Sequence, residues 1–118
     1  MKRNTILKIA VVLLLFGSCK KDKLAAPSYP ANISFKTQLV PIFTKDCFSC
    51  HGGSTQPNLK TNLYKAITST STQGTGVNVA TPTGSGIYKT LQGKMAGKMS
   101  SGDVNLVLGW ITQGAKNN

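Results

Sequence analysis

The sequence predicts an all-α domain of about four short helices joined by long loops. Apolar residues recur at helical spacing in four segments, and no segment alternates apolar and polar residues as a typical strand does. The stretches between these segments are rich in glycine, serine and threonine, which disfavour regular structure. No internal repeat divides the chain of 118 residues, and we therefore expect a single small domain.

Residues 1–32 are expected to lie outside this domain. Residues 1–18 have the layout of a secretory signal, because basic residues precede an apolar run that is too short to span a bilayer. The stretch FGSC resembles the cleavage box of bacterial lipoproteins, which makes Cys19 the predicted lipidated N-terminus; an ordinary signal peptide is the alternative. Residues 19–32 contain two prolines and no apolar periodicity, which predicts a flexible, lipid-anchored tether. The domain is placed at residues 33–118, exported and attached to a bacterial membrane on the periplasmic or outer-membrane side.

The first helix is predicted in SFKTQLVPIFTKDC. Its apolar residues share one helical face: Phe35, Leu39, Ile42 and Phe43. Pro41 lies inside this pattern, so the helix should kink there or begin nearby.

The second helix is predicted in NLKTNLYKAIT, and a long loop follows it. Leu59, Leu63 and Ile67 are four residues apart, and Thr61 is the candidate N-cap. Residues 69–84 are mostly threonine, serine and glycine with one proline, which predicts a long loop without regular structure.

Two further helices are predicted in the C-terminal third of the chain. In SGIYKTLQG, Ser85 is a candidate cap and Ile87 and Leu91 share a face. The last helix has the clearest periodicity, carried by Val104, Val107, Leu108 and Ile111. Ser100 and Asp103 have the spacing of a capping box, and Gly114 suits the end of this helix.

The stretch DCFSCHGG, residues 46–53, contains the chain's single histidine, His51, together with Cys47 and Cys50. Four uses compete for this cluster: a redox disulfide, a structural disulfide, a zinc site and covalent haem attachment. A closed zinc site would lack one ligand, and a thioredoxin-like pair would require a parallel sheet that the sequence does not predict. Haem accounts for all three residues, because thiols at this spacing reach both vinyl groups of one ring and place the following histidine beneath the iron. Gly52 and Gly53 are expected to permit a sharp exit after His51.

Together with LVPIFTKDCFSCHGG, the stretches SGIYKTLQGKM and LGWITQGA resemble class I c-type cytochromes, in particular small lipoprotein or planctomycete-type and Bacteroidetes cytochrome c domains. The resemblance extends from about Phe35 to Ala115. It implies a cytochrome c-like fold in which the first and last helices cross and about four short helices pack around one covalent haem c per chain. It also implies that Cys47 and Cys50 carry the thioethers and that His51 is the proximal iron ligand.

The resemblance further implies that a loop methionine is the distal ligand. Counted back from Trp110, Met95 falls near the position of that ligand, and Met99 is the alternative. Trp110, Tyr64 and Tyr88 are expected to pack in the core, with hydrogen bonds to the haem propionates as their alternative use.

Single-electron transfer is the expected function. Met/His ligation fills both axial positions of the iron, and the predicted mature chain has only Asp22, Asp46 and Asp103 as carboxylates. A general acid–base site therefore lacks components, and no enzymatic activity is predicted. The alternative is a haem-based module that binds or senses a small gas at an open or weakly filled sixth position.

The charge pattern favours protein partners over nucleic acid. The net charge is +11, but the lysines are scattered singly and the only arginine belongs to the signal segment, so the bidentate donors preferred in phosphate and base recognition are missing. We expect redox protein partners with an acidic docking surface, and membrane attachment through the N-terminal lipid.

Overall fold

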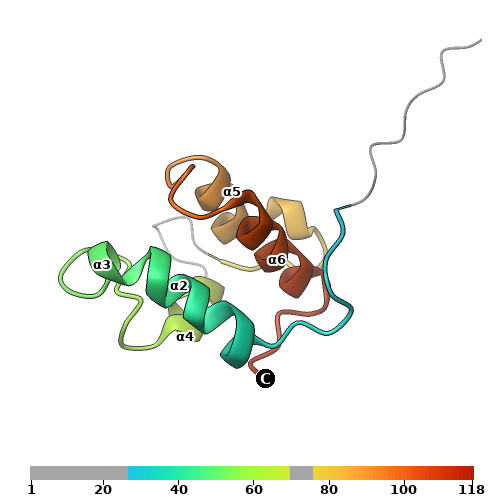
Figure 1. Cartoon of the computed structure of the whole chain (residues 1–118), viewed down its shortest axis with the longest axis horizontal. Helices are drawn as coiled ribbons and strands as arrows, with labels where there is room; N and C mark the ends of the chain where they lie inside the picture. Colours follow the sequence, from blue (N-terminus) through green and yellow to red (C-terminus); the bar gives the residue numbers. More distant parts are fainter. Residues whose placement is uncertain (1–26, 70–75) are drawn as a thin grey trace, which may run out of the picture.

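The computed structural model of the chain describes residues 27–69 and 76–118. Within these ranges the chain is helical and forms no strand, which confirms the all-α prediction. The signal segment, Cys19 and most of the predicted tether lie outside the described residues. The elements follow in the order η2 (Phe35–Leu39), α2 (Val40–Asp46), α3 (Phe48–His51), α4 (Leu63–Thr68), η3 (Pro82–Gly84), α5 (Gly86–Gln92) and α6 (Ser101–Thr112). Helices α2, α3 and α4 lie on one side of the molecule, and α5 and α6 lie on the other (Figure 1).

The first helical segment changes its geometry at the predicted position. Residues Phe35–Leu39 form a π-helical turn in which the Val40 N–H donates to the Phe35 carbonyl, and α2 begins at Val40. Pro41 is in the first turn of α2, where its missing N–H does the least damage. The prediction of a break near Pro41 is therefore confirmed.

A residue from the far end of the chain caps this segment. The Phe35 N–H donates to Asn118 Oδ1 at 2.9 Å, and the Lys36 N–H donates to the Asn118 carbonyl at 2.9 Å. Ser34 accepts from the Thr37 N–H through its hydroxyl. These contacts satisfy N–H groups that the first turn of a helix leaves without partners.

The predicted apolar faces of the later helices are buried, but one predicted cap is wrong and another caps without its side chain. The N-cap of α4 is Asn62, whose side chain accepts from the Lys65 N–H at 3.0 Å, and not Thr61. Ser85 is the N-cap residue of α5, as predicted, but its buried hydroxyl bonds the backbone of Asn78 and makes no capping hydrogen bond. At α4 the neighbouring residue Asn62 provides the capping side chain. At α5 the loop that contains Asn78 binds the hydroxyl of Ser85.

The N-terminus and the end of α6 are as predicted. Ser100 accepts from the Asp103 N–H at 3.1 Å and donates its hydroxyl to the Asp103 carboxylate at 2.8 Å. The short Asp103 side chain thus meets the cap hydroxyl, where the longer Glu of a full capping box would reach the cap N–H. Gly114 follows the helix with φ of 97°, a left-handed conformation that favours glycine.

The buried apolar residues form one core, in which Phe35 and Trp110 form an aromatic cluster with the partly buried Tyr64. The ring centroid of Phe35 lies 5.2 Å from that of Tyr64 and 5.3 Å from that of Trp110. The Trp110 Nε1–H donates to the Lys116 carbonyl at 2.8 Å, and the Tyr64 hydroxyl donates to the Ala115 carbonyl at 2.9 Å. The expected core packing of Trp110 and Tyr64 is therefore confirmed.

Residues just before the first helix pack on α6. The Tyr29 ring lies so close to Gly109 that a Cβ added there would be 2.6 Å from Tyr29 Cδ2. Gln113 joins the same two segments, because its side chain accepts from the Ile33 N–H at 2.8 Å and donates to the Pro30 carbonyl at 2.7 Å. Contacts with the domain thus begin inside the range predicted as tether.

Candidate functional site

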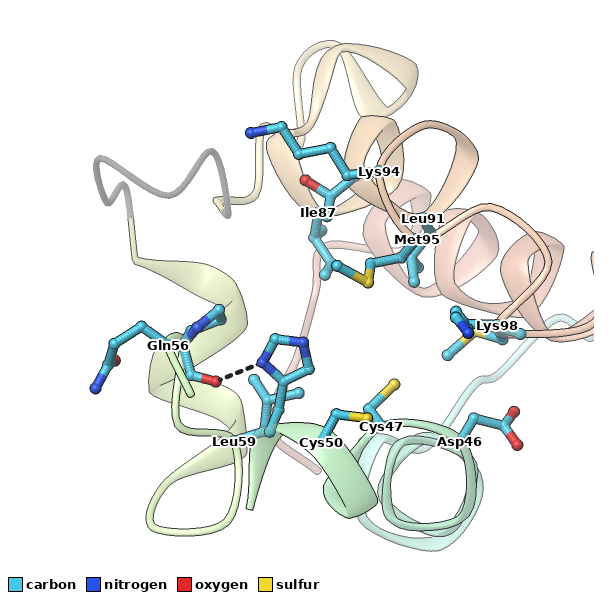
Figure 2. Close-up of a pocket in the computed structure, with 14 residues that line it drawn as sticks. Asp46, Cys47, Cys50, Gln56, Leu59, Ile87, Leu91, Lys94, Met95 and Lys98 are labelled. Carbon is cyan, nitrogen blue, oxygen red and sulfur yellow. Dashed lines mark hydrogen bonds between the residues drawn. The ribbon is translucent and has the colours of Figure 1, made fainter. Parts of the chain in front are cut away.

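A pocket separates the two sides of the molecule and collects most of the predicted site residues. One wall comes from α3 and the loop after it and contains Cys47, Cys50, His51, Pro57 and Leu59. The opposite wall comes from α5 and the loop after it and contains Ile87, Leu91, Met95 and Met99. Figure 2 shows the side chains of Cys47, Cys50 and Met95 extending into this shared space. The pocket has a volume of about 150 Å³ and is partly open to solvent.

His51 is held by the backbone of the loop that follows it. Its Nδ1 lies 3.2 Å from the Pro57 carbonyl oxygen, and its own carbonyl accepts from the Leu59 N–H at 2.8 Å. A carbonyl can only accept, so the Nδ1 atom must carry the proton in this contact. The Nε2 atom of neutral His51 is then left with a free lone pair, which is the form that binds a metal.

The exit from α3 needs one of the two predicted glycines. A Cβ at Gly52 would collide with the carbonyl oxygen of Phe48, whereas a Cβ at Gly53 would meet nothing. The expected structural role is confirmed for Gly52, and the structure gives no such reason for Gly53. The loop also depends on Asn58, which sequence reasoning missed: its amide donates to the Gly53 carbonyl at 2.8 Å and its oxygen accepts from the Lys60 N–H at 3.0 Å. Asparagine is common in such turns, which was the only available signal.

The two thiols occupy different environments. Cys50 is exposed, whereas Cys47 is half-buried at the junction of α2 and α3. Burial raises the pKa of Cys47 to about 11, and the nearby charges of Asp46 and Cys50 act in the same direction. Cys47 is therefore a protonated thiol at neutral pH. Because the thiolate is the nucleophilic form of cysteine, Cys47 is a poor nucleophile.

Both candidate methionines line the pocket, but they are packed differently. Met99 is 6% exposed and belongs to the core just before α6, whereas Met95 is only partly buried at the edge of that core. The Met95 N–H donates to the Thr90 carbonyl at 2.9 Å, and its carbonyl accepts from the Lys98 N–H at 3.1 Å. These bonds hold the Met95 backbone within tight turns, and its sulfur points into the pocket (Figure 2).

Charged side chains stand around the rim of the pocket. Lys98 and Asp46 lie on the side where Cys47 lies, whereas Lys94 extends from the opposite side, toward which Gln56 also lies (Figure 2). The Lys45 ammonium is 3.4 Å from the Asp46 carboxylate and 3.8 Å from that of Asp103, which links α2 to the start of α6. These pairs are partly exposed and therefore contribute little to stability.

The side chains that could bind a metal or a cofactor lie on two different walls of the pocket. Among the described residues, no three His, Cys, Asp or Glu side chains are grouped to hold a metal ion. The cysteines and His51 lie along one wall, and the methionine sulfurs come from the other.

In the part of the chain that the structure describes, no helix has the length and apolar character needed to cross a membrane. No family model, no curated protein and no solved structure matches this chain.

Proposed function

We propose that this protein is an exported, lipid-anchored mono-haem c-type cytochrome with a cytochrome c-like fold, which carries single electrons between membrane-associated redox partners. The observation that carries the proposal is the shared pocket, in which Cys47, Cys50 and His51 face a wall that contains Met95 and Met99. The attachment motif is contiguous in the sequence, but the methionines come from a separate segment that the fold brings across from it.

The residues present fit a covalently attached haem. Cys47 and Cys50 would hold it by adding their S–H groups across its two vinyl groups, His51 would bind the iron through Nε2, and Met95 would bind it through sulfur from the other face. The apolar wall residues Leu59, Ile87 and Leu91 suit the faces of the ring. When bound, the haem supplies an iron that cycles between the ferrous and ferric states.

The environment of the cysteines disfavours the competing uses of the motif. A redox-active Cys-x-x-Cys pair depends on a thiol whose pKa is lowered, whereas burial raises the pKa of Cys47 to about 11. Zinc requires ligands that converge on one point, and in residues 27–69 and 76–118 no such group of side chains is present. Covalent addition to haem requires neither a lowered pKa nor convergence.

The optical spectrum of the exported protein tests the proposal. The chain is produced in a bacterium with c-type haem maturation, and the wild type is compared with Met95→Ala and Met99→Ala in both oxidation states. We expect a covalent, low-spin haem whose weak sulfur-to-iron band is lost in Met95→Ala and kept in Met99→Ala. Each variant serves as the control for the other, because both methionines line the pocket.

The other outcomes point to different functions. A high-spin spectrum that binds carbon monoxide readily and is unchanged by either substitution would replace electron transfer with gas binding or sensing. Export without covalent haem would instead indicate a thiol or metal module. Loss of the sulfur band only in Met99→Ala would keep the function and reassign the distal ligand.

The mature chain that begins at Cys19 has 11 Lys and 3 Asp, and its net charge of +8 supports a partner with an acidic docking surface. Attraction between oppositely charged surfaces speeds their encounter and is screened by salt. The rate of electron exchange with an acidic redox protein should therefore fall as the ionic strength rises, whereas exchange with a small neutral reductant should stay nearly constant.

A further inference from the structure

We propose that the Lys94 ammonium binds a propionate carboxylate of the haem at the end of the pocket opposite the cysteines. The inference rests on the proposed function and deepens it, because it assigns a partner to the charged edge of the cofactor. The propionates introduce two negative charges into a pocket whose walls are largely apolar. A carboxylate that is removed from water without a partner is costly, so the position of cations around the rim matters.

The chemistry of the ring fixes which end of the pocket the propionates must reach. In haem the two vinyl groups occupy neighbouring pyrroles, and the two propionates occupy the other two. Thioethers to Cys47 and Cys50 would therefore hold the vinyl edge at the cysteine wall. The propionate edge would then extend away from these cysteines.

Lys94 is the cation at that end of the pocket. Among the described residues that line the pocket, the lysines are Lys94 and Lys98. Lys98 lies on the same side of the view as Asp46 and Cys47, whereas Lys94 lies on the opposite side and its side chain extends away from the cysteines (Figure 2). The position of Lys98 therefore suits the exposed thioether edge, and Lys94 is left for the propionates.

Two of the three aromatic donors expected from the sequence are used elsewhere. The Trp110 indole N–H bonds the Lys116 carbonyl, and the Tyr64 hydroxyl bonds the Ala115 carbonyl. The Tyr88 hydroxyl accepts from the Gln92 amide at 2.6 Å. None of these aromatic residues lines the pocket, so they do not compete with Lys94 for the carboxylate.

The exposure of Lys94 sets the expected size of the effect. Its side chain is exposed, and ion pairs in contact with water are weak. We therefore expect the contact to be seen at the propionate itself, whereas haem attachment and protein stability should hardly change. A vibrational readout of the propionate is accordingly the appropriate measurement.

The test is the resonance Raman spectrum of the haem-loaded protein, in which the propionate bending band reports hydrogen bonding at the carboxylate. Lys94→Gln is compared with Lys98→Gln, at the other end of the pocket, and with Lys89→Gln, on the exposed face of α5 and outside the pocket. We expect the band to shift in Lys94→Gln alone and to keep its wild-type position in Lys94→Arg, which retains the charge.

Two kinds of result would overturn the inference, and they are distinguishable. If mass spectrometry shows one covalent haem but the band stays in place in Lys94→Gln, or shifts only in Lys98→Gln, the Lys94 assignment is wrong and the proposed function stands. If the exported wild-type chain has no haem mass, the proposed function fails and this inference fails with it.

Discussion

The aromatic cluster and the pocket differ in how far the polypeptide alone completes them. At the aromatic cluster three rings pack against one another, and the polar atoms of Trp110 and Tyr64 have backbone partners. At the pocket the walls are equally well defined, but thiols, a thioether and apolar side chains face an open space. The polypeptide alone fills the first region, whereas in the second region its side chains line a pocket. Substitutions in the two regions should therefore have different consequences.

The largest expected effect is at the aromatic cluster. Trp110 is 1% exposed, and Trp110→Ala should lower the free energy of unfolding of the exported protein by about 3–5 kcal/mol, because it removes a large buried side chain and leaves a cavity. Urea unfolding followed by circular dichroism measures this change.

Trp110→Phe is the matched control, because it keeps one aromatic ring and removes the indole N–H that bonds the Lys116 carbonyl. Its cost should be smaller, although the unpaired carbonyl and the lost ring volume still contribute about 1–3 kcal/mol. If Trp110→Ala lowered the free energy of unfolding no more than Trp110→Phe does, the aromatic cluster would not be a well-packed part of the core.

The sequence predicts the core better than the pocket. Helical periodicity identifies Leu39, Phe43 and Ile111 as buried, because burial repeats at the spacing of the helix. The contiguous motif likewise selects the two cysteines and His51, which line the same wall of the pocket. The pocket residues that come from other segments cannot be predicted from a local pattern, because the fold brings them there. Pro57 contacts His51 through the loop after α3. Lys94 lines the pocket because α5 is packed beside it. The same limit explains why the hydroxyl of the predicted cap Ser85 bonds Asn78 instead.

Met99 tests where the core ends and the pocket begins. It is buried in the core and also lines the pocket, so Met99→Ala should lower the free energy of unfolding by about 2–5 kcal/mol. Met99→Leu nearly conserves the volume and should cost less than about 1.5 kcal/mol. Urea unfolding provides both values. A Met99→Leu protein that unfolds easily and has lost its sulfur-to-iron band would instead move Met99 from the core to the iron.

The alkylation rates of the two cysteines test whether the pocket wall is formed in the chain without haem. The pKa of Cys47 is raised from 9.0 to about 11, so its thiolate fraction at neutral pH is roughly 100-fold below that of an ordinary thiol. Alkylation at pH 7 should therefore modify the exposed Cys50 first, and mass spectrometry of the peptides measures both rates. As the pH rises toward 11, the rate at Cys47 should increase steadily. Equal alkylation rates at the two cysteines would mean that Cys47 is not buried in the chain without haem, and that this wall of the pocket forms only when haem is bound.

The smallest expected effect compares two glycines of the same helix, Gly109 and Gly102. A Cβ at Gly109 would lie 2.6 Å from Tyr29 Cδ2 and 2.8 Å from Ile33 Cδ1, so Gly109→Ala should cost about 1–3 kcal/mol by overpacking, beyond any gain in helix propensity. A Cβ at Gly102, in the first turn of α6, would meet nothing closer than Ser100 Oγ at 3.8 Å. Gly102→Ala should therefore stabilise α6 by about 0.5–1 kcal/mol.

Gly109→Ala should destabilise the protein and Gly102→Ala should stabilise it, so the pair tests the packing of Tyr29 on α6. Tyr29→Ala removes most of the obstacle at Gly109, so Gly109→Ala should cost less in that background, and thermal unfolding of the four proteins gives the coupling between the two sites. If the cost of Gly109→Ala were the same with and without the Tyr29 ring, residues just before the first helix would not pack on α6 in solution. The core would then begin at Ile33, where the sequence places the start of the domain.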